Sequence, residues 1–228
     1  MLRKVAKPMR PDAIVFDLDG TLIDSAADLS NTLNLLLTEH NRPHLSVESV
    51  RGMIGDGVGA LVRRGFAATG EPVALTDHAL LTQRFLELYI DPRRDHLAHP
   101  YPGVVETLQA FADLGIAMGV CTNKAQVATD LVLRDAGLSE FFTAVIGQDS
   151  APAPKPDPAH VLAVCAALGG PNVAVMVGDS RNDVRAGQSA GLKVVMVTYG
   201  YGTPEALAAA DARIDRFADL PAAILELP

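Results

Sequence analysis

The strongest constraint on the fold is an alternation of short apolar runs with stretches of helical periodicity. The apolar runs are hydrophobic at consecutive positions, which is typical of strands that are covered on both faces in a parallel sheet. The helical stretches each stop at a glycine, which ends a helix because it adopts positive φ without a steric penalty. The expected strands are residues 13–16, 116–121, 144–146, 173–177 and 194–197, and the expected helices are 104–113, 126–136, 160–168 and 183–190.

Strands and helices in series predict right-handed crossovers, and therefore an α/β fold with a doubly wound, mostly parallel, Rossmann-like sheet. Residues 24–100 break this alternation, because they contain helical patterns and no convincing strand. Ser25 and Asp28 resemble a capping box, a leucine stripe follows, and further helices are expected at 47–54, 60–68 and 78–90. We therefore predict an α/β core of residues 11–23 and 101–228 with an inserted α-helical cap domain of residues 24–100.

Composition and charge exclude several classes of protein. The 228 residues are 49% hydrophobic and 20% charged, which is enough to bury a sizeable core. The net charge of −8 argues against nucleic acid as a partner, because proteins that bind phosphate backbones are normally basic. No apolar run reaches the roughly 18–20 residues of a membrane span, so we expect no membrane partner. Residues 1–10 are expected to be a loose leader, the protein cytoplasmic, and Cys121 and Cys165 buried thiols.

Carboxylates follow two of the expected strands, at the edge where a doubly wound sheet binds its ligands. Asp17 and Asp19 follow the first strand, and Asp179 and Asp183 follow the fourth. Four carboxylates that crowd together need a cation, since like charges would otherwise raise their pKa values. An all-oxygen donor set favours magnesium over zinc. The sequence therefore predicts that Asp17, Asp19, Asp179 and Asp183 hold Mg²⁺, with Asp183 acting directly or through water.

The remaining polar groups at this edge indicate a phosphate site. The Thr122 hydroxyl, the Lys155 ammonium and a helix start after Lys124 suit phosphate oxygens, and with magnesium they define a phosphoryl-transfer site. Asp17 is the predicted nucleophile, which forms an aspartyl-phosphate. Asp19 points to the same side of the extended chain and is the predicted general acid and base. Further phosphate contacts are expected from the tight turn at Gly20, from Leu18 and from Asn123.

The four stretches read DLDGT, VCTNK, KPDP and VGDSRND, and in this order they resemble the motifs of the haloacid dehalogenase superfamily, specifically its phosphatase branch. The resemblance spans the whole chain, including the cap. The stretches HPYPGV, VGDSRNDVRAGQSAG and TYGYG are similar to those of bacterial phosphoglycolate phosphatases. This resemblance implies Mg²⁺-dependent hydrolysis of a small phosphorylated metabolite, 2-phosphoglycolate, to glycolate and phosphate.

Four other reactions and one non-enzymatic role are alternatives to this interpretation. A sugar-phosphate phosphatase is one of them, and a mutase similar to β-phosphoglucomutase keeps the same core but returns the phosphoryl group of the phosphoaspartate to a sugar and not to water. Dehalogenases lack an acid at the position of Asp19. Phosphonoacetaldehyde hydrolase needs a cap lysine, and residues 24–100 contain none. A receiver-like phosphoacceptor domain has no long helical insertion.

Several residues have two interpretations. Arg63 and Arg64 follow a glycine-rich loop in the cap, so either one is a candidate for binding a substrate carboxylate, although paired arginines on a helix more often form a solvated face. Asp24 is expected to cap the first cap helix or to lie at a hinge. We also expect Thr122 to cap a helix, glycines 55, 57 and 59 to form a turn, and His96 and His99 to lie at the surface.

Overall fold

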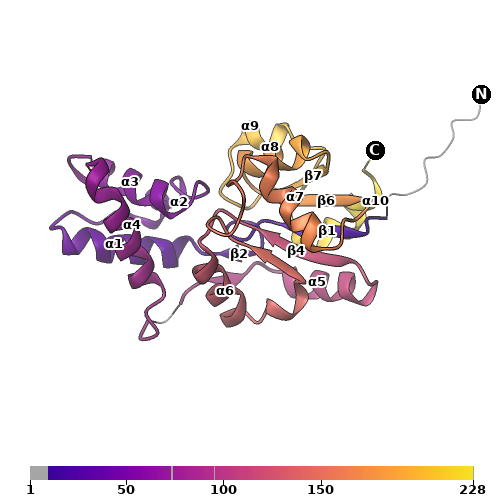
Figure 1. Cartoon of the computed structure of the whole chain (residues 1–228), viewed down its shortest axis with the longest axis horizontal. Helices are drawn as coiled ribbons and strands as arrows, with labels where there is room; N and C mark the ends of the chain where they lie inside the picture. Colours follow the sequence, from indigo (N-terminus) through magenta and orange to yellow (C-terminus); the bar gives the residue numbers. More distant parts are fainter. Residues whose placement is uncertain (1–9, 73, 95, 228) are drawn as a thin grey trace, which may run out of the picture.

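The computed structural model describes residues 10–72, 74–94 and 96–227. The expected leader therefore falls outside the described residues except for its last position. Figure 1 shows an elongated molecule with a helical half at one end and a half that contains the main sheet at the other. Among the described helices, none is both long enough and apolar enough to cross a membrane.

The main sheet has six strands in the described chain, all parallel, in the order β5-β4-β1-β6-β7-β8. From the central β1, the chain runs outward on one side through β4 and β5 and on the other side through β6, β7 and β8. This reversal places a topological switch point at β1 and confirms the predicted doubly wound fold. The strands are β1 (Ala13–Phe16), β4 (Ala117–Cys121), β5 (Ala144–Ile146), β6 (Ala174–Gly178), β7 (Lys193–Val197) and β8 (Ala212–Ile214).

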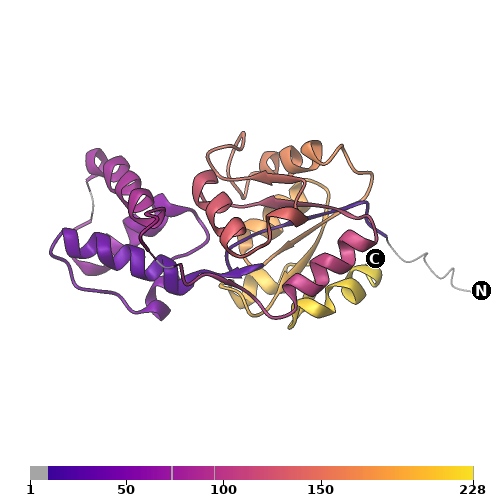
Figure 2. The ribbon, with the colours of Figure 1, turned by 90° about the horizontal axis from the view of Figure 1, so that it is seen from below.

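Both faces of the sheet are covered by helices (Figure 2). Ile14 and Phe16 of β1 belong to one hydrophobic core, with α5, α6 and α10, while Val15 belongs to a second core, with α7, α8 and α9. Because successive side chains of a strand point to opposite faces, every position of β1 is apolar. The helices are α5 (Val104–Asp113), α6 (Gln126–Asp135), α7 (Pro158–Ala167), α8 (Arg181–Ser189), α9 (Pro204–Ala208) and α10 (Leu220–Leu225), with short 3₁₀ turns η1 (Ser139–Phe141) and η2 (Phe217–Asp219).

The helical half consists of α1 (Ala26–Glu39), α2 (Val47–Arg51), α3 (Val58–Thr69) and α4 (Leu75–Tyr89). The α1 and α3 helices approach closely at Gly65, where an added Cβ would lie 2.8 Å from a methyl carbon of Leu33. Two short strands, β2 (Ile23–Asp24) and β3 (His99–Pro100), pair in antiparallel fashion where the chain enters and leaves this half.

The structure corrects several expectations about local elements. The five expected strands form within one residue of their expected ends, but β2, β3 and β8 were not predicted. The β2 and β3 strands have two residues each, too few to show a period, and Arg213 interrupts the apolar residues of β8. The capping box at Ser25 is wrong, because the Ser25 hydroxyl donates to Asp19 and caps no backbone group of α1. Asp28 is fully buried and its Oδ2 lies 2.8 Å from Nδ1 of His96. His96 is therefore a largely buried residue, contrary to expectation.

Candidate active site

The switch point of the sheet gathers the sequence-predicted residues. Asp17 directly follows β1, Thr122 follows β4 and Asp179 follows β6, and these three strands are neighbours in the sheet. Asp183 lies in the first turn of α8, which begins two residues after Asp179. Because parallel strands end at the same edge of a sheet, residues far apart in the sequence meet at one place.

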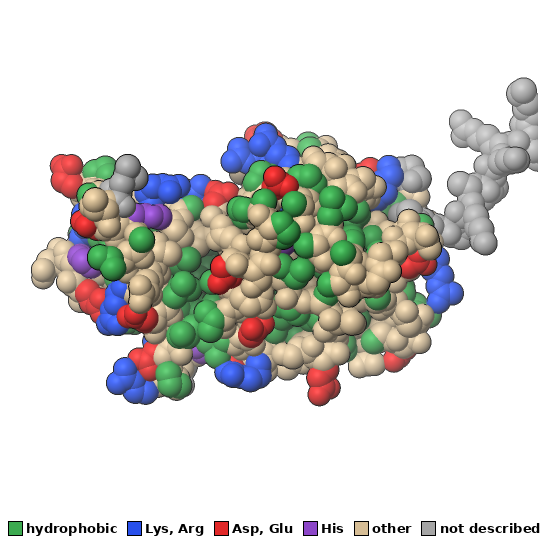
Figure 3. All heavy atoms as spheres, viewed as in Figure 1, with side chains coloured by type: hydrophobic (Ala, Val, Ile, Leu, Met, Phe, Trp, Pro, Cys, Tyr) green, Lys and Arg blue, Asp and Glu red, His purple; other side chains and the backbone are tan. Residues whose placement is uncertain are grey.

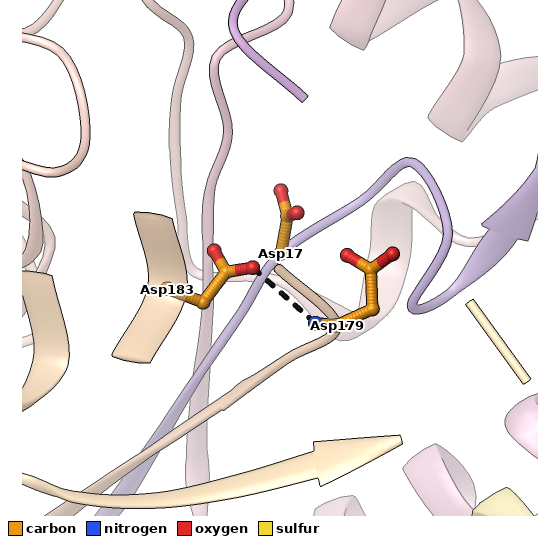
Figure 4. A group of neighbouring side chains, drawn as sticks. All are labelled: Asp17, Asp179 and Asp183. Atoms are coloured by element: carbon orange, nitrogen blue, oxygen red, sulfur yellow. Dashed lines mark hydrogen bonds between the residues drawn. The ribbon is translucent and has the colours of Figure 1, made fainter. Parts of the chain in front are cut away.

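Asp17, Asp179 and Asp183 form a compact group of buried carboxylates, with ligand oxygens within 4.8 Å of one another (Figure 4). Backbone N–H groups orient each of them. Leu18 N donates to Asp17 Oδ1 at 2.7 Å, and Tyr201 N donates to Asp179 Oδ2 at 2.5 Å. Asp183 Oδ2 accepts from the backbone N–H groups of residues 179 and 180, at 3.2 and 2.8 Å. The three side chains are therefore held in place by the fold itself.

A buried lysine completes this group. The Nζ atom of Lys155 lies 2.9 Å from Asp17 Oδ1 and 2.6 Å from Asp183 Oδ1, and its side chain is only 2% exposed. Burial opposes the charge of this ammonium, but the carboxylates of Asp17 and Asp183 outweigh burial and raise its pKa above the ordinary value. Lys155 is therefore a permanent cation at the base of the site.

One lysine does not neutralise three buried carboxylates. Burial raises the pKa of Asp17 to about 7, the negative charge of Asp183 adds to the rise, and the Lys155 ammonium opposes it. Burial, followed by the charges of Asp183 and Asp17, also raises the pKa of Asp179 well above its ordinary value. A group of hard oxygen donors that carries excess negative charge fits a divalent cation such as Mg²⁺.

Asp19 lies outside that group of three, although the sequence placed it among the metal ligands. Its Oδ1 accepts a 2.6 Å hydrogen bond from the Ser25 hydroxyl, and Nζ of Lys124 lies 3.2 and 3.3 Å from its two carboxylate oxygens. Lys124 itself lies 4.5 Å from the ring centroid of Tyr89 in α4. Asp17 and Asp19 thus have different surroundings.

The expected phosphate contacts are placed as follows. The Gly20 backbone has φ of 86°, and an added Cβ would lie 2.4 Å from Asp179 Oδ2, so only glycine fits there. The side chain of Leu18 is fully buried. Thr122 accepts the Lys124 N–H at 3.2 Å and caps no helix, because α6 begins at Gln126; the expectation of a cap was wrong.

Asn123 links the two halves of the molecule. Its Nδ2 donates to the carbonyl oxygen of Lys155 at 2.9 Å and to that of Gly55, in the loop between α2 and α3, at 3.1 Å. Asn182 reaches the same loop, with hydrogen bonds to Asp56 Oδ1 at 2.7 Å and to the Gly55 carbonyl at 3.2 Å. The structure therefore has the loop of residues 54–58 docked over the site.

The family model of the haloacid dehalogenase-like hydrolases matches residues 14–197, which include all four motifs. The chain belongs to this family. The phosphoglycolate phosphatase of Caulobacter vibrioides is 45% identical over 216 residues, which are 94% of this chain and 91% of that protein. Phosphoglycolate phosphatase 1 of Pseudomonas aeruginosa is 40% identical over 217 residues, which are 92% of this chain and 78% of that protein.

Solved structures of the family share the fold of this hydrolase. A predicted phosphoglycolate phosphatase from Haemophilus somnus matches with a TM-score of 0.83 and 32% identity, over 92% of this chain and 96% of that one. CbbY from Rhodobacter sphaeroides, in complex with phosphate, matches with a TM-score of 0.79 and 23% identity, over the same two shares. The second similarity supports the fold alone.

The pocket of the hydrolase lies between the core edge and the helical half. Asp17, Asp19, Thr122, Asn123 and Lys124 line its core side. The side chains that line it from the helical half are apolar or aromatic: Leu29, Ile54, Val58, Leu61, Phe85, Leu86 and Tyr89. Figure 3 shows apolar side chains gathered where the two halves meet on the visible face.

The two arginines proposed from the sequence do not line this pocket. Arg63 is exposed and Arg64 is partly exposed, and both border a separate surface hollow beside His78. Arg64 pairs with Asp56 and donates to the Met53 carbonyl at 2.7 Å, so it braces the docked loop. Helical spacing alone did not show which way these side chains point.

Tyr201 was not predicted as a site residue, although it lies in the TYGYG stretch. Its backbone N–H holds Asp179, while its hydroxyl donates to Asp24 Oδ1 at 2.9 Å and accepts the Ser25 N–H at 2.9 Å. Arg51 of α2 lies over its ring at 5.2 Å and 3.6 Å from Asp24 Oδ2. Asp24 also accepts the N–H of Ala26 at 3.3 Å, so it both caps α1 and joins the two halves.

Proposed function

We propose that this hydrolase is a Mg²⁺-dependent phosphomonoesterase that forms an aspartyl-phosphate on Asp17 and acts on 2-phosphoglycolate. The observation that carries the proposal is the contrast between the two carboxylates after β1. Asp17 lies among buried acids and Lys155, while Asp19 lies apart with Ser25 and Lys124. The names of the most similar curated relatives support the choice of substrate.

The reaction follows from these positions. A carboxylate oxygen of Asp17 forms a bond to phosphorus as the ester bond breaks. Asp19 gives its proton to the departing ester oxygen, and then takes a proton from the water that hydrolyses the aspartyl-phosphate. Lys155 and Thr122 bind phosphate oxygens. When bound by Asp17, Asp179 and Asp183, Mg²⁺ offsets the repulsion between the phosphate and the carboxylates.

Water has to be excluded until the phosphoenzyme forms, and we assign this task to residues 24–100. The docked loop of residues 54–58 is fastened to the core by Asn123 and Asn182, and the apolar side chains above Asp17 leave little for water to bind. We propose that these residues move as a cap that opens to release products. The enzyme would act in the cytoplasm, where its two free cysteines stay reduced.

A phosphate-release assay tests the substrate and the metal together. Wild-type enzyme is measured with 2-phosphoglycolate, glucose phosphates and triose phosphates, each with Mg²⁺ and with a chelator. We expect kcat/KM for 2-phosphoglycolate to exceed the others by at least about 100-fold. Activity should vanish with the chelator and return with added Mg²⁺. Equal turnover of sugar phosphates, or activity that persists in the chelator, contradicts the proposal.

A further inference from the structure

The pocket offers one unusual cation. Of its lining residues in the described part of the chain, Lys124 is the one with a positively charged side chain. Lys155 lies deeper, between Asp17 and Asp183, at the phosphate end. The side chain of Lys124 is only 5% exposed. Burial of a charged group is unfavourable unless an oppositely charged group, from the protein or from a ligand, compensates for the lost water.

The position of Lys124 relative to Asp19 defines which part of a substrate it meets. Asp19 has to lie within hydrogen-bonding distance of the ester oxygen that it protonates. The Lys124 ammonium lies 3.2 Å from that same carboxylate. In 2-phosphoglycolate, a single methylene carbon separates the ester oxygen from the carboxylate. A cation beside the general acid is therefore placed where the negative end of this leaving group would lie.

We propose that Lys124 binds the carboxylate of 2-phosphoglycolate and is the residue that selects this substrate over phosphomonoesters whose leaving group carries no charge. The inference rests on the proposed function and deepens it. An ammonium has three N–H donors, and among the described residues Asp19 is the one hydrogen-bonding partner of the Lys124 ammonium. Donors thus remain for a substrate carboxylate. The ring of Tyr89 steadies the ammonium without neutralising its charge.

The rest of the pocket explains why this one contact would decide specificity. The side chains that face the leaving group from the helical half include Leu29, Phe85 and Leu86, which have no hydrogen-bonding groups. The hydroxyl groups of a sugar phosphate would lose their water there without finding hydrogen-bonding partners, which disfavours their binding. A short leaving group with one charged end meets no such penalty, because Lys124 replaces the water that its carboxylate loses.

A simpler alternative is that Lys124 only holds Asp19 in position. The two roles separate when substrates with and without the carboxylate are compared in the same variant. Ethyl phosphate is the matched probe, because it carries a methyl group in place of the carboxylate of 2-phosphoglycolate. If Lys124 only positions Asp19, its removal slows both substrates by one factor. If it binds the carboxylate, the loss is far larger for 2-phosphoglycolate.

The experiment measures kcat and KM for both substrates in wild type, Lys124→Met, Lys124→Arg and Arg63→Met. We expect Lys124→Met to lower kcat/KM for 2-phosphoglycolate about 100-fold more than for ethyl phosphate, mainly through KM. Lys124→Arg should recover part of the preference, because it keeps the charge. Arg63→Met tests the other candidate cation and should leave the preference unchanged. Lys193→Met is the matched control, because it removes a lysine of β7 that pairs with Asp211.

Each outcome bears on a different statement. Equal losses for both substrates in Lys124→Met would overturn the inference and leave the proposed function standing. A loss of preference in Arg63→Met would move the carboxylate site to the helical half. A wild-type enzyme with no preference for 2-phosphoglycolate over ethyl phosphate would overturn the substrate and this inference together. If Lys124→Met does not fold, as judged by thermal unfolding, Lys124→Gln provides the same comparison.

Discussion

The two sides of the pocket differ in side-chain chemistry, because one is charged and the other is apolar. The core side and the buried group beneath it contain four carboxylates and two lysines, and each charged group has an oppositely charged or N–H partner. The side that faces them from the helical half is made of apolar side chains and glycines. Its polar link to the core is largely the Gly55 carbonyl and Asp56, which accept hydrogen bonds from two asparagines.

This difference follows from what each side has to do. Groups that handle charge in the reaction need fixed positions, and the ends of buried parallel strands provide them. In the motion that we propose for residues 24–100, the facing side leaves and re-enters water in every cycle, and charges on it would have to be desolvated each time. Apolar side chains avoid that cost. The contrast predicts large catalytic effects on the core side and modest ones on the facing side.

The largest effect is expected for Asp17→Asn. The amide keeps the shape of the side chain and an oxygen that accepts the Leu18 N–H, but it is no nucleophile. We expect phosphate release to fall by at least about 10⁴-fold, with a melting temperature within a few degrees of wild type. Activity within tenfold of wild type would show that another group attacks phosphorus, and it would contradict the expectation that the largest catalytic effects lie on the core side.

A smaller effect is expected where the two sides touch. Asn182→Ala removes hydrogen bonds to Asp56 and Gly55 that hold the docked loop. Each is worth about 1 kcal/mol, so the loss of both should lower kcat/KM by up to about 30-fold, mainly through a higher KM. Gln188→Ala is the control, because Gln188 lies on the same helix and donates to the Ala209 carbonyl instead. Equal kinetics in the two variants would show that docking of this loop contributes nothing to binding.

The smallest effect concerns the pH dependence of stability in the core. Burial lowers the pKa of His160 from 6.5 to about 4, and its Nε2 donates to the Ile146 carbonyl at 3.0 Å. Between these two values the unfolded chain binds the extra proton, so the free energy of unfolding falls as pH drops through this window. His160→Gln should flatten that decline in urea titrations between pH 7 and about pH 4. If the free energy of unfolding declines equally with pH in the variant and in wild type, His160 is not the cause of the decline.

The positions of the core groups could be predicted because parallel geometry leaves little choice. Once Asp17, Thr122 and Asp179 are recognised as following strands, they must lie at one edge of the sheet. Helical periodicity carries no such information for the other half. It predicted the helix α3 but not the side of the helix on which the Arg63 side chain lies. It also gave no indication that Asp28 contacts His96, which is far from it in the sequence. The role of Lys124 beside Asp19 depends on tertiary contacts of the same long-range kind.

The pairing of β2 with β3 has a consequence for how such enzymes diversify. Ile23 lies opposite Pro100 and Asp24 opposite His99, so the entire helical half is attached to the core through two adjacent segments of chain. Another insert whose ends came equally close together would leave the register of the six parallel strands unchanged. Such an exchange would alter the side of the pocket that faces the leaving group and would leave the carboxylates of the core in place.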